Sequence, residues 1–168
     1  LRFLRSSMLR SNFMQLCDIY LGLGEDRFHQ LVRSISLSRL KTYQLFDRAK
    51  TRFHLAKLNS DILRKASPRI WVRVNEKDED FASDLAQFIL VGHLDMIKGV
   101  LDFLGIPNEG GFFAKDSDAS SHLTDGWQQR AWEKFSDAYD KSALLFYINH
   151  LDWELKKDAA ATFLPDQV

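Results

Sequence analysis

The sequence predicts an all-α fold, a single domain built as a bundle or array of about seven helices. Apolar residues recur along most of the chain at the three- and four-residue spacing of an amphipathic helix. Runs of β-branched residues with alternating polarity, which would indicate strands, are almost absent. The chain has three prolines, and each stands where a helix is expected to begin or end.

The composition allows a sizeable hydrophobic core without cross-links. Of the 168 residues, 45% are hydrophobic, and the 13 Phe and 4 Trp bring large side chains to bury. Cys17 is the single cysteine, which excludes an internal disulfide and a zinc knuckle, favours a reducing, cytoplasmic setting and itself suits a small buried thiol. No run approaches the roughly 20 apolar residues of a membrane span, because Asp95, Lys98 and Asp102 interrupt the best candidate.

The first helix is expected over residues 1–21, ending at the Gly22-Leu23-Gly24 turn, and a short helix over 25–35. Residues 1–17 carry three arginines and no acid, a composition that organelle transit peptides share. An amphipathic first helix of the mature protein explains the same residues, and we favour this interpretation.

The clearest helical pattern covers residues 37–58, with Ser36 as the expected N-cap. On a helical wheel, basic residues border both sides of its apolar stripe. These six candidate binding residues are Lys41, Arg48 and Arg52 on one edge and Arg39, Lys50 and Lys57 on the other.

The middle of the chain predicts two short helices and a long one. Ser60 is a candidate cap for a turn over residues 60–66, and a second helix starts near Pro68. The longest helix is expected over 79–104, with Asp78 as N-cap and Gly105 as C-cap. Gly92 and Gly99 within it indicate close approach of another helix, or a kink near Gly92.

A long loop is expected near 106–124, followed by helices over 126–139 and 141–157 with Asp125 and Asp140 as caps. Phe112 and Phe113 lie within this loop. They either anchor the loop into the core, which we favour, or contact a partner, so both are candidate binding residues. The four tryptophans are expected to pack in the core or between helices.

Charge is distributed unevenly. The net charge is zero, but residues 1–73 hold 15 basic and 5 acidic side chains, and residues 74–168 hold 8 and 18. Either the basic half and the acidic half neutralise each other within the chain or across a dimer, or the basic half meets an anionic partner. A nucleic-acid partner would give an affinity that falls steeply with salt.

A short internal repeat is the pattern closest to a site. His93-Leu94-Asp95 and His150-Leu151-Asp152 each follow four apolar residues and a small or polar one. Metal binding or acid–base chemistry would need His93 and His150 to converge. The alternative, which we favour, is two half-buried histidines and two solvated aspartates with helical partners in Lys98 and Lys156.

No phosphate loop, nucleophile elbow or zinc-protease motif occurs, and no cofactor is predicted. The sequence therefore favours binding over catalysis. We expect a helical interaction protein that self-associates or engages a protein partner. A nucleic-acid-binding protein is the second hypothesis, and a metal-binding protein or enzyme that uses His93 and His150 is the third.

Overall fold

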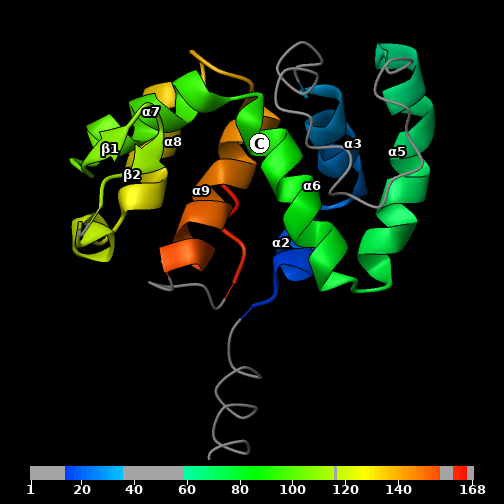
Figure 1. Cartoon of the computed structure of the whole chain (residues 1–168), viewed down its shortest axis with the longest axis horizontal. Coiled ribbons are helices and arrows are strands. Elements are labelled where there is room, and N and C mark those ends of the chain that lie inside the picture. The colour runs from blue at the N-terminus through cyan, green and yellow to red at the C-terminus, as the bar shows by residue number, and fades with distance from the viewer. Residues whose placement is uncertain (1–13, 36–58, 116, 156–160, 166–168) are drawn as a thin grey trace, which may run out of the picture.

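A computed structural model describes residues 14–35, 59–115, 117–155 and 161–165 of the chain. It confirms the all-α prediction (Figure 1). The described helices are α2 (Leu16–Leu23), α3 (Glu25–Arg33), α5 (Ser60–Asn75), α6 (Glu79–Val91), α7 (Leu94–Phe103), α8 (Trp127–Phe135) and α9 (Lys141–Leu155). The helix expected over 37–58, with its six candidate basic residues, lies outside the described residues, as does the whole of segment 1–13.

Helix α9 is the centre of the fold. It lies between α7, α8 and the hairpin on one side and α2, α3 and α6 on the other (Figure 1). Nine of its fifteen residues are buried, because helices pack against several of its faces. A helix that is apolar on all faces is stable only when it is enclosed in this way. Asp152 is one of the buried nine, so the prediction that it is solvated is wrong.

Helix α5 corrects the prediction of two short helices. It runs unbroken through Pro68, which lies on its exposed side. Buried residues on the opposite side, including Leu63, Ile70 and Val74, pack the helix against its neighbours, chiefly α3, and this packing offsets the hydrogen bond that proline cannot donate. The N-cap is Asn59 rather than Ser60, since its side chain accepts a bond from the backbone N–H of Ile62 at 3.0 Å.

The long helix expected over 79–104 is divided in two. Asp78 caps α6 as predicted, accepting a hydrogen bond from the N–H of Phe81 at 3.1 Å. The break at Gly92 and His93 agrees with the alternative of a kink there. Helix α7 then ends before Gly105, whose φ of +74° is the left-handed conformation that glycine adopts without strain.

The segment 106–124 is more ordered than a plain loop. It contains a hairpin of β1 (Asn108–Glu109) and β2 (Phe112–Phe113) and a 3-10 helix, η3 (Ala119–His122). Helix α8 has Gly126 at its N-cap, so the expected Asp125 cap is wrong. Asp140 does cap α9, accepting from the N–H of Ala143 at 2.9 Å. Within the described residues, no helix is both long and apolar enough to cross a bilayer.

Glu79 joins the start of α6 to the start of α2. Its carboxylate accepts hydrogen bonds from the backbone N–H groups of Leu16 and Cys17. These N–H groups belong to the first turn of α2 and have no acceptor within that helix. A negative charge there also interacts favourably with the helix dipole. One side chain thus fixes the position of α2, whose buried face includes Leu16, Ile19 and Tyr20.

We expect Glu79→Ala to lower the free energy of unfolding by about 1 to 2 kcal/mol, since it leaves two backbone donors of α2 without their acceptor. Urea denaturation followed by circular dichroism measures this. Asp80→Ala is the matched control, because it removes the neighbouring acid from the same first turn of α6. Equal losses in the two variants would show that Glu79 acts only on α6.

Candidate functional site

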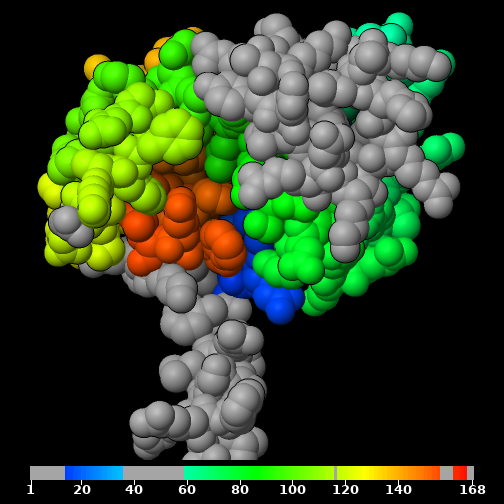
Figure 2. Space-filling model, viewed as in Figure 1, coloured from blue at the N-terminus to red at the C-terminus, as the bar shows by residue number. Residues whose placement is uncertain are grey.

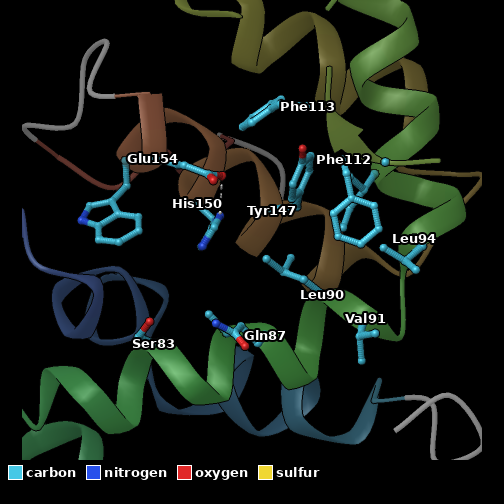
Figure 3. Close-up of a pocket in the computed structure, with 14 residues that line it drawn as sticks. Ser83, Gln87, Leu90, Val91, Leu94, Phe112, Phe113, Tyr147, His150 and Glu154 are labelled. Atoms are coloured by element: carbon cyan, nitrogen blue, oxygen red, sulfur yellow. Dashed lines mark ion pairs between the residues drawn. The ribbon is translucent and has the colours of Figure 1, made fainter. Parts of the chain in front are cut away.

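A pocket of about 540 Å³ lies between α6, α7, the hairpin and α9. It is lined by Ser83, Ala86, Gln87, Leu90, Val91, Leu94, Ile97, Gly111, Phe112, Phe113, Tyr147, His150, Trp153 and Glu154 (Figure 3). Most of these side chains are apolar, and a few polar groups stand among them. A concave apolar site with few polar groups is typical of small-molecule binding sites.

The polar and apolar groups occupy different parts of the pocket. Figure 3 shows Ser83, Gln87 and His150 toward one end, and Leu94, Val91 and Phe112 toward the other. On α6, Ser83, Gln87 and Leu90 follow the helical spacing of three and four residues, so they share the face that meets the pocket. The pocket is therefore amphipathic along its length.

His150 is the most constrained polar group of the pocket. Its side chain is only 12% exposed, and its ring packs between Phe146 and Trp153, with centroids 5.8 and 5.5 Å away. Burial lowers the pKa of His150 to about 4, so the imidazole is neutral at physiological pH. This agrees with the expectation of a half-buried histidine.

Glu154 stands one turn after His150 on the same helix. Its carboxylate Oε2 lies 3.7 Å from Nδ1 of His150, which is too long for a hydrogen bond. Nδ1 is buried and has no hydrogen-bond partner among the described residues. Partial burial raises the pKa of Glu154. Burial, together with this carboxylate, also raises the pKa of Tyr147 well above its usual range.

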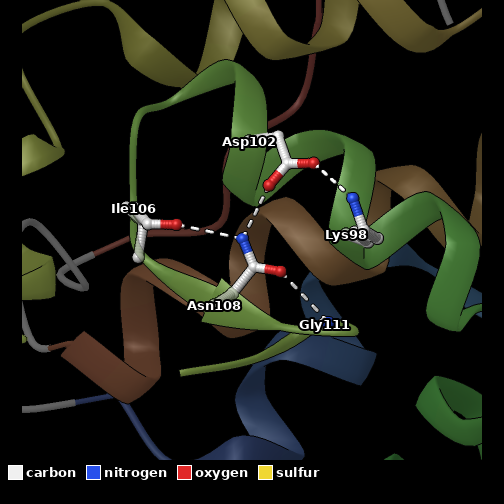
Figure 4. A network of polar contacts seen from close by, with 5 residues as sticks. All are labelled: Lys98, Asp102, Ile106, Asn108 and Gly111. Carbon is white, nitrogen blue, oxygen red and sulfur yellow. Dashed lines mark hydrogen bonds and ion pairs between the residues drawn. The ribbon is translucent and has the colours of Figure 1, made fainter. Parts of the chain in front are cut away.

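A polar network outside the pocket holds the hairpin in place (Figure 4). The Asn108 amide donates to Asp102 at 2.8 Å and to the Ile106 carbonyl at 3.0 Å, and its oxygen accepts from the N–H of Gly111 at 3.2 Å. Lys98 donates to the other oxygen of Asp102 at 2.7 Å, and these two partners lower the pKa of Asp102. The network ties the hairpin that carries Phe112 and Phe113 to α7.

The two phenylalanines of the hairpin have different environments. Phe113 is partly buried and packs against the core, which agrees with the expected anchoring role. Phe112 is 61% exposed although it lines the pocket, so it stands at the pocket's edge. Gly111 between α7 and the pocket has a φ of +98°, and a Cβ there would lie 3.3 Å from the carbonyl oxygen of Leu94. The hairpin thus approaches α7 closely.

The repeated His-Leu-Asp segments occupy different environments. His93 lies at the start of α7, where its Nε2 is 3.1 Å from the Ser34 hydroxyl, and it does not line the pocket that His150 lines. Lys98, the expected partner of Asp95, instead pairs with Asp102. Within the described part of the chain, no three His, Cys, Asp or Glu residues are grouped as metal ligands.

Cys17 is fully buried in α2, as expected. Burial, followed by the nearby Glu79, raises the pKa of the thiol to about 12. A thiol needs its thiolate form to act as a nucleophile. Cys17 is therefore a packing residue, as the sequence suggested. The tryptophans also pack as expected: Trp127 and Trp132 are buried, and Trp71 and Trp153 are partly buried against the core.

The basic and acidic halves of the chain are in contact through α2, α3 and α5 against α6 and α9. Arg73 and Asp78 form an ion pair across this division at 3.2 Å. Lys77 and Asp18 pair with the charges reversed, a base from the acidic half with an acid from the basic half. The described ion pairs thus give little support to direct neutralisation of one half by the other.

The fold and the site define an all-α protein with an enclosed central helix and an amphipathic pocket beside it. Comparison with protein-family models, with curated proteins and with solved structures finds no match to this chain. Sequence analysis missed Ser83, Gln87, Tyr147 and Glu154 as pocket residues. The four-residue spacing of His150 and Glu154 was a visible signal for one of them.

We expect His150 to make stability depend on pH. The unfolded chain binds a proton at the ordinary pKa of 6.5, whereas the folded chain does so only near pH 4. The free energy of unfolding therefore falls as pH falls from about 6.5 to 4, by up to roughly 3 kcal/mol. The raised pKa of Glu154 acts in the opposite direction, so the informative quantity is the stability difference between the wild type and His150→Gln.

Urea denaturation of both proteins at several pH values measures this difference. The free energy of unfolding of the wild type, relative to that of His150→Gln, should fall toward pH 4. His122→Gln, which removes a partly exposed imidazole from η3, shows the effect of losing a histidine elsewhere. A difference between wild type and His150→Gln that stays constant over this range would contradict the burial of a neutral His150.

Asn108→Ala should loosen the hairpin without unfolding the protein. The loss of about 1 kcal/mol of hydrogen bonding predicts roughly fivefold faster amide exchange at Gly111 and its neighbours. Hydrogen–deuterium exchange with mass spectrometry reports this locally. Asn75→Ala is the matched control, because Asn75 donates one bond to the Trp71 carbonyl on α5. Unchanged exchange in the hairpin would show that the network does not hold it.

Proposed function

We propose that this protein is a binding protein that holds a small, largely apolar ligand in the pocket beside α9. The observation that carries the proposal is the pocket itself, with a volume of about 540 Å³ and a lining of apolar side chains around a few polar groups. This volume lies within the roughly 300–1,000 Å³ of typical ligand sites. A neutral, buried His150 suits the binding of an uncharged or weakly polar group.

The described surface favours a small ligand over a protein partner. The large apolar side chains exposed on it are Val72 of α5, Phe103 of α7, Phe112 of β2, and Leu164, which lies outside the described helices and strands. A large contiguous apolar patch marks many protein interaction sites, and side chains spread over separate segments are a weaker signal of one. Among the four, Phe112 also lines the pocket, so its exposure has an explanation in ligand binding.

Access to the site is consistent with this proposal. Figure 2 shows α9 reaching the surface between the hairpin region and α2, although most of the helix is enclosed. The side chain of Glu154, near the end of α9, is 45% exposed. A ligand can therefore approach this end of the pocket from solvent.

A protein partner, self-association and a cytoplasmic location remain predictions. Nucleic-acid binding also remains a prediction, and its six candidate residues from Arg39 to Lys57 lie outside the described residues. Helix α5 adds three exposed basic residues to that hypothesis, namely Arg64, Lys65 and Arg69. No described arrangement brings His93 and His150 into one site, so chemistry that needs both gains no support.

The test is direct binding of N-phenyl-1-naphthylamine, an uncharged apolar dye that fluoresces when it leaves water. We expect saturable binding with one dye per chain. Leu90→Trp should weaken it by at least about tenfold, because the larger side chain fills space at the apolar end of the pocket. Val72→Trp, on the exposed side of α5, is the matched control and should leave binding unchanged. Binding that is not saturable, or that Leu90→Trp leaves intact, would overturn the proposal.

A further inference from the structure

The charged side chains that line the pocket are acidic only. Glu154 is the one acidic residue among the lining residues, and none of them is Lys or Arg. An anionic group in the pocket would meet this carboxylate with no cation among the described lining residues to compensate. Burying an unpaired charge next to a like charge costs free energy that apolar contacts must offset. The lining therefore disfavours a carboxylate or phosphate ligand.

His150 favours a ligand that donates a hydrogen bond. The Glu154 carboxylate lies on the Nδ1 side of the ring, so the tautomer with its proton on Nδ1 is electrostatically favoured. Nε2 is then an acceptor. Figure 3 shows this ring atom, opposite the contact with Glu154, pointing into the pocket on the side of Gln87. A neutral imidazole with a free acceptor nitrogen in an apolar pocket favours a ligand that donates a hydrogen bond.

The apolar end adds the second requirement. Leu90, Val91, Leu94, Ile97 and Phe112 offer no hydrogen-bonding side chain, so a polar group placed there would lose its contacts with water. Ligands must therefore be polar at one end and apolar along the rest. Ser83 and Val91 are eight residues apart on α6, about 12 Å at the helical rise per residue, which suits an extended chain or a ring system better than a compact polar molecule.

We propose that the pocket selects an amphiphile whose head group donates a hydrogen bond to Nε2 of His150, an alcohol or an amine, and that it rejects the corresponding carboxylate. This inference rests on the proposed function, since it specifies the ligand class of the same pocket. An alcohol satisfies His150 without adding charge. An amine, as its ammonium form, gains in addition from Glu154.

Three ligands with the same ten-carbon chain test the head group. Decan-1-ol, decylamine and decanoate are each used to displace N-phenyl-1-naphthylamine from the full chain at pH 7.5. The alcohol is kept below its solubility limit, and the two ionic ligands below their micelle-forming concentrations. We expect the alcohol and the amine to displace the dye at concentrations at least about tenfold lower than decanoate does. Decanoate that competes as well as decan-1-ol would overturn the inference.

Variants at the polar end then test whether His150 and Glu154 determine the head-group preference. His150→Leu should weaken decan-1-ol binding by roughly five- to tenfold and leave decanoate unchanged, because only the donor loses its acceptor. His150→Gln retains an acceptor oxygen and should retain part of the preference. Glu154→Gln, at a side chain that is 45% exposed, should improve decanoate binding and weaken decylamine binding. Variants that leave all three affinities unchanged would overturn the assignment of the head group to this end.

The outcomes separate the inference from the proposed function. Saturable dye binding without discrimination among the three head groups would reject the inference and support the pocket as a general apolar site. Absence of saturable dye binding would reject both. Circular dichroism spectra that match the wild type confirm that each variant is folded before its affinities are compared.

Discussion

The burial of α9 is the constraint on which the rest of the structure depends. A fifteen-residue helix with nine buried residues needs neighbours on several sides, and α2, α3, α6 and α8 supply them. The same enclosure explains the chemistry of the site. His150 is neutral because burial on this helix lowers its pKa. Burial also raises the pKa values of Glu154 and Tyr147 on the same helix. The pocket is the region beside α9 that its neighbours leave unfilled.

Local signals predicted the elements of the fold well. Asp78 and Asp140 cap helices where their sequence positions suggested, because an N-cap depends only on residues within one turn. Gly105 marks the end of α7 for an equally local reason, its backbone conformation. The errors came where distant contacts decide. Packing against α3 keeps α5 continuous through Pro68, and no short-range rule contains that information.

The site was harder to predict than the fold. His150 drew attention through a sequence repeat with His93, but the structure gives the two residues unrelated environments. Ser83 and Gln87 are ordinary helix-surface residues in sequence, and they matter only because α9 and the hairpin lie opposite them. Asp152 was expected in solvent from its helical spacing to Lys156, yet it is buried. The exposed face of a central helix depends on all the helices packed around it, and the spacing of residues within that helix does not contain this information.

The break between α6 and α7 has a consequence for how this site can change over time. Gly92 and His93 let α7 leave the direction of α6, so the two walls of the pocket contributed by Leu90 and Leu94 belong to separate helices. Substitutions at this junction can alter the angle between the walls while the core around α9 stays intact. The shape of the pocket is thus open to evolution, or to redesign, through two residues that do not line it.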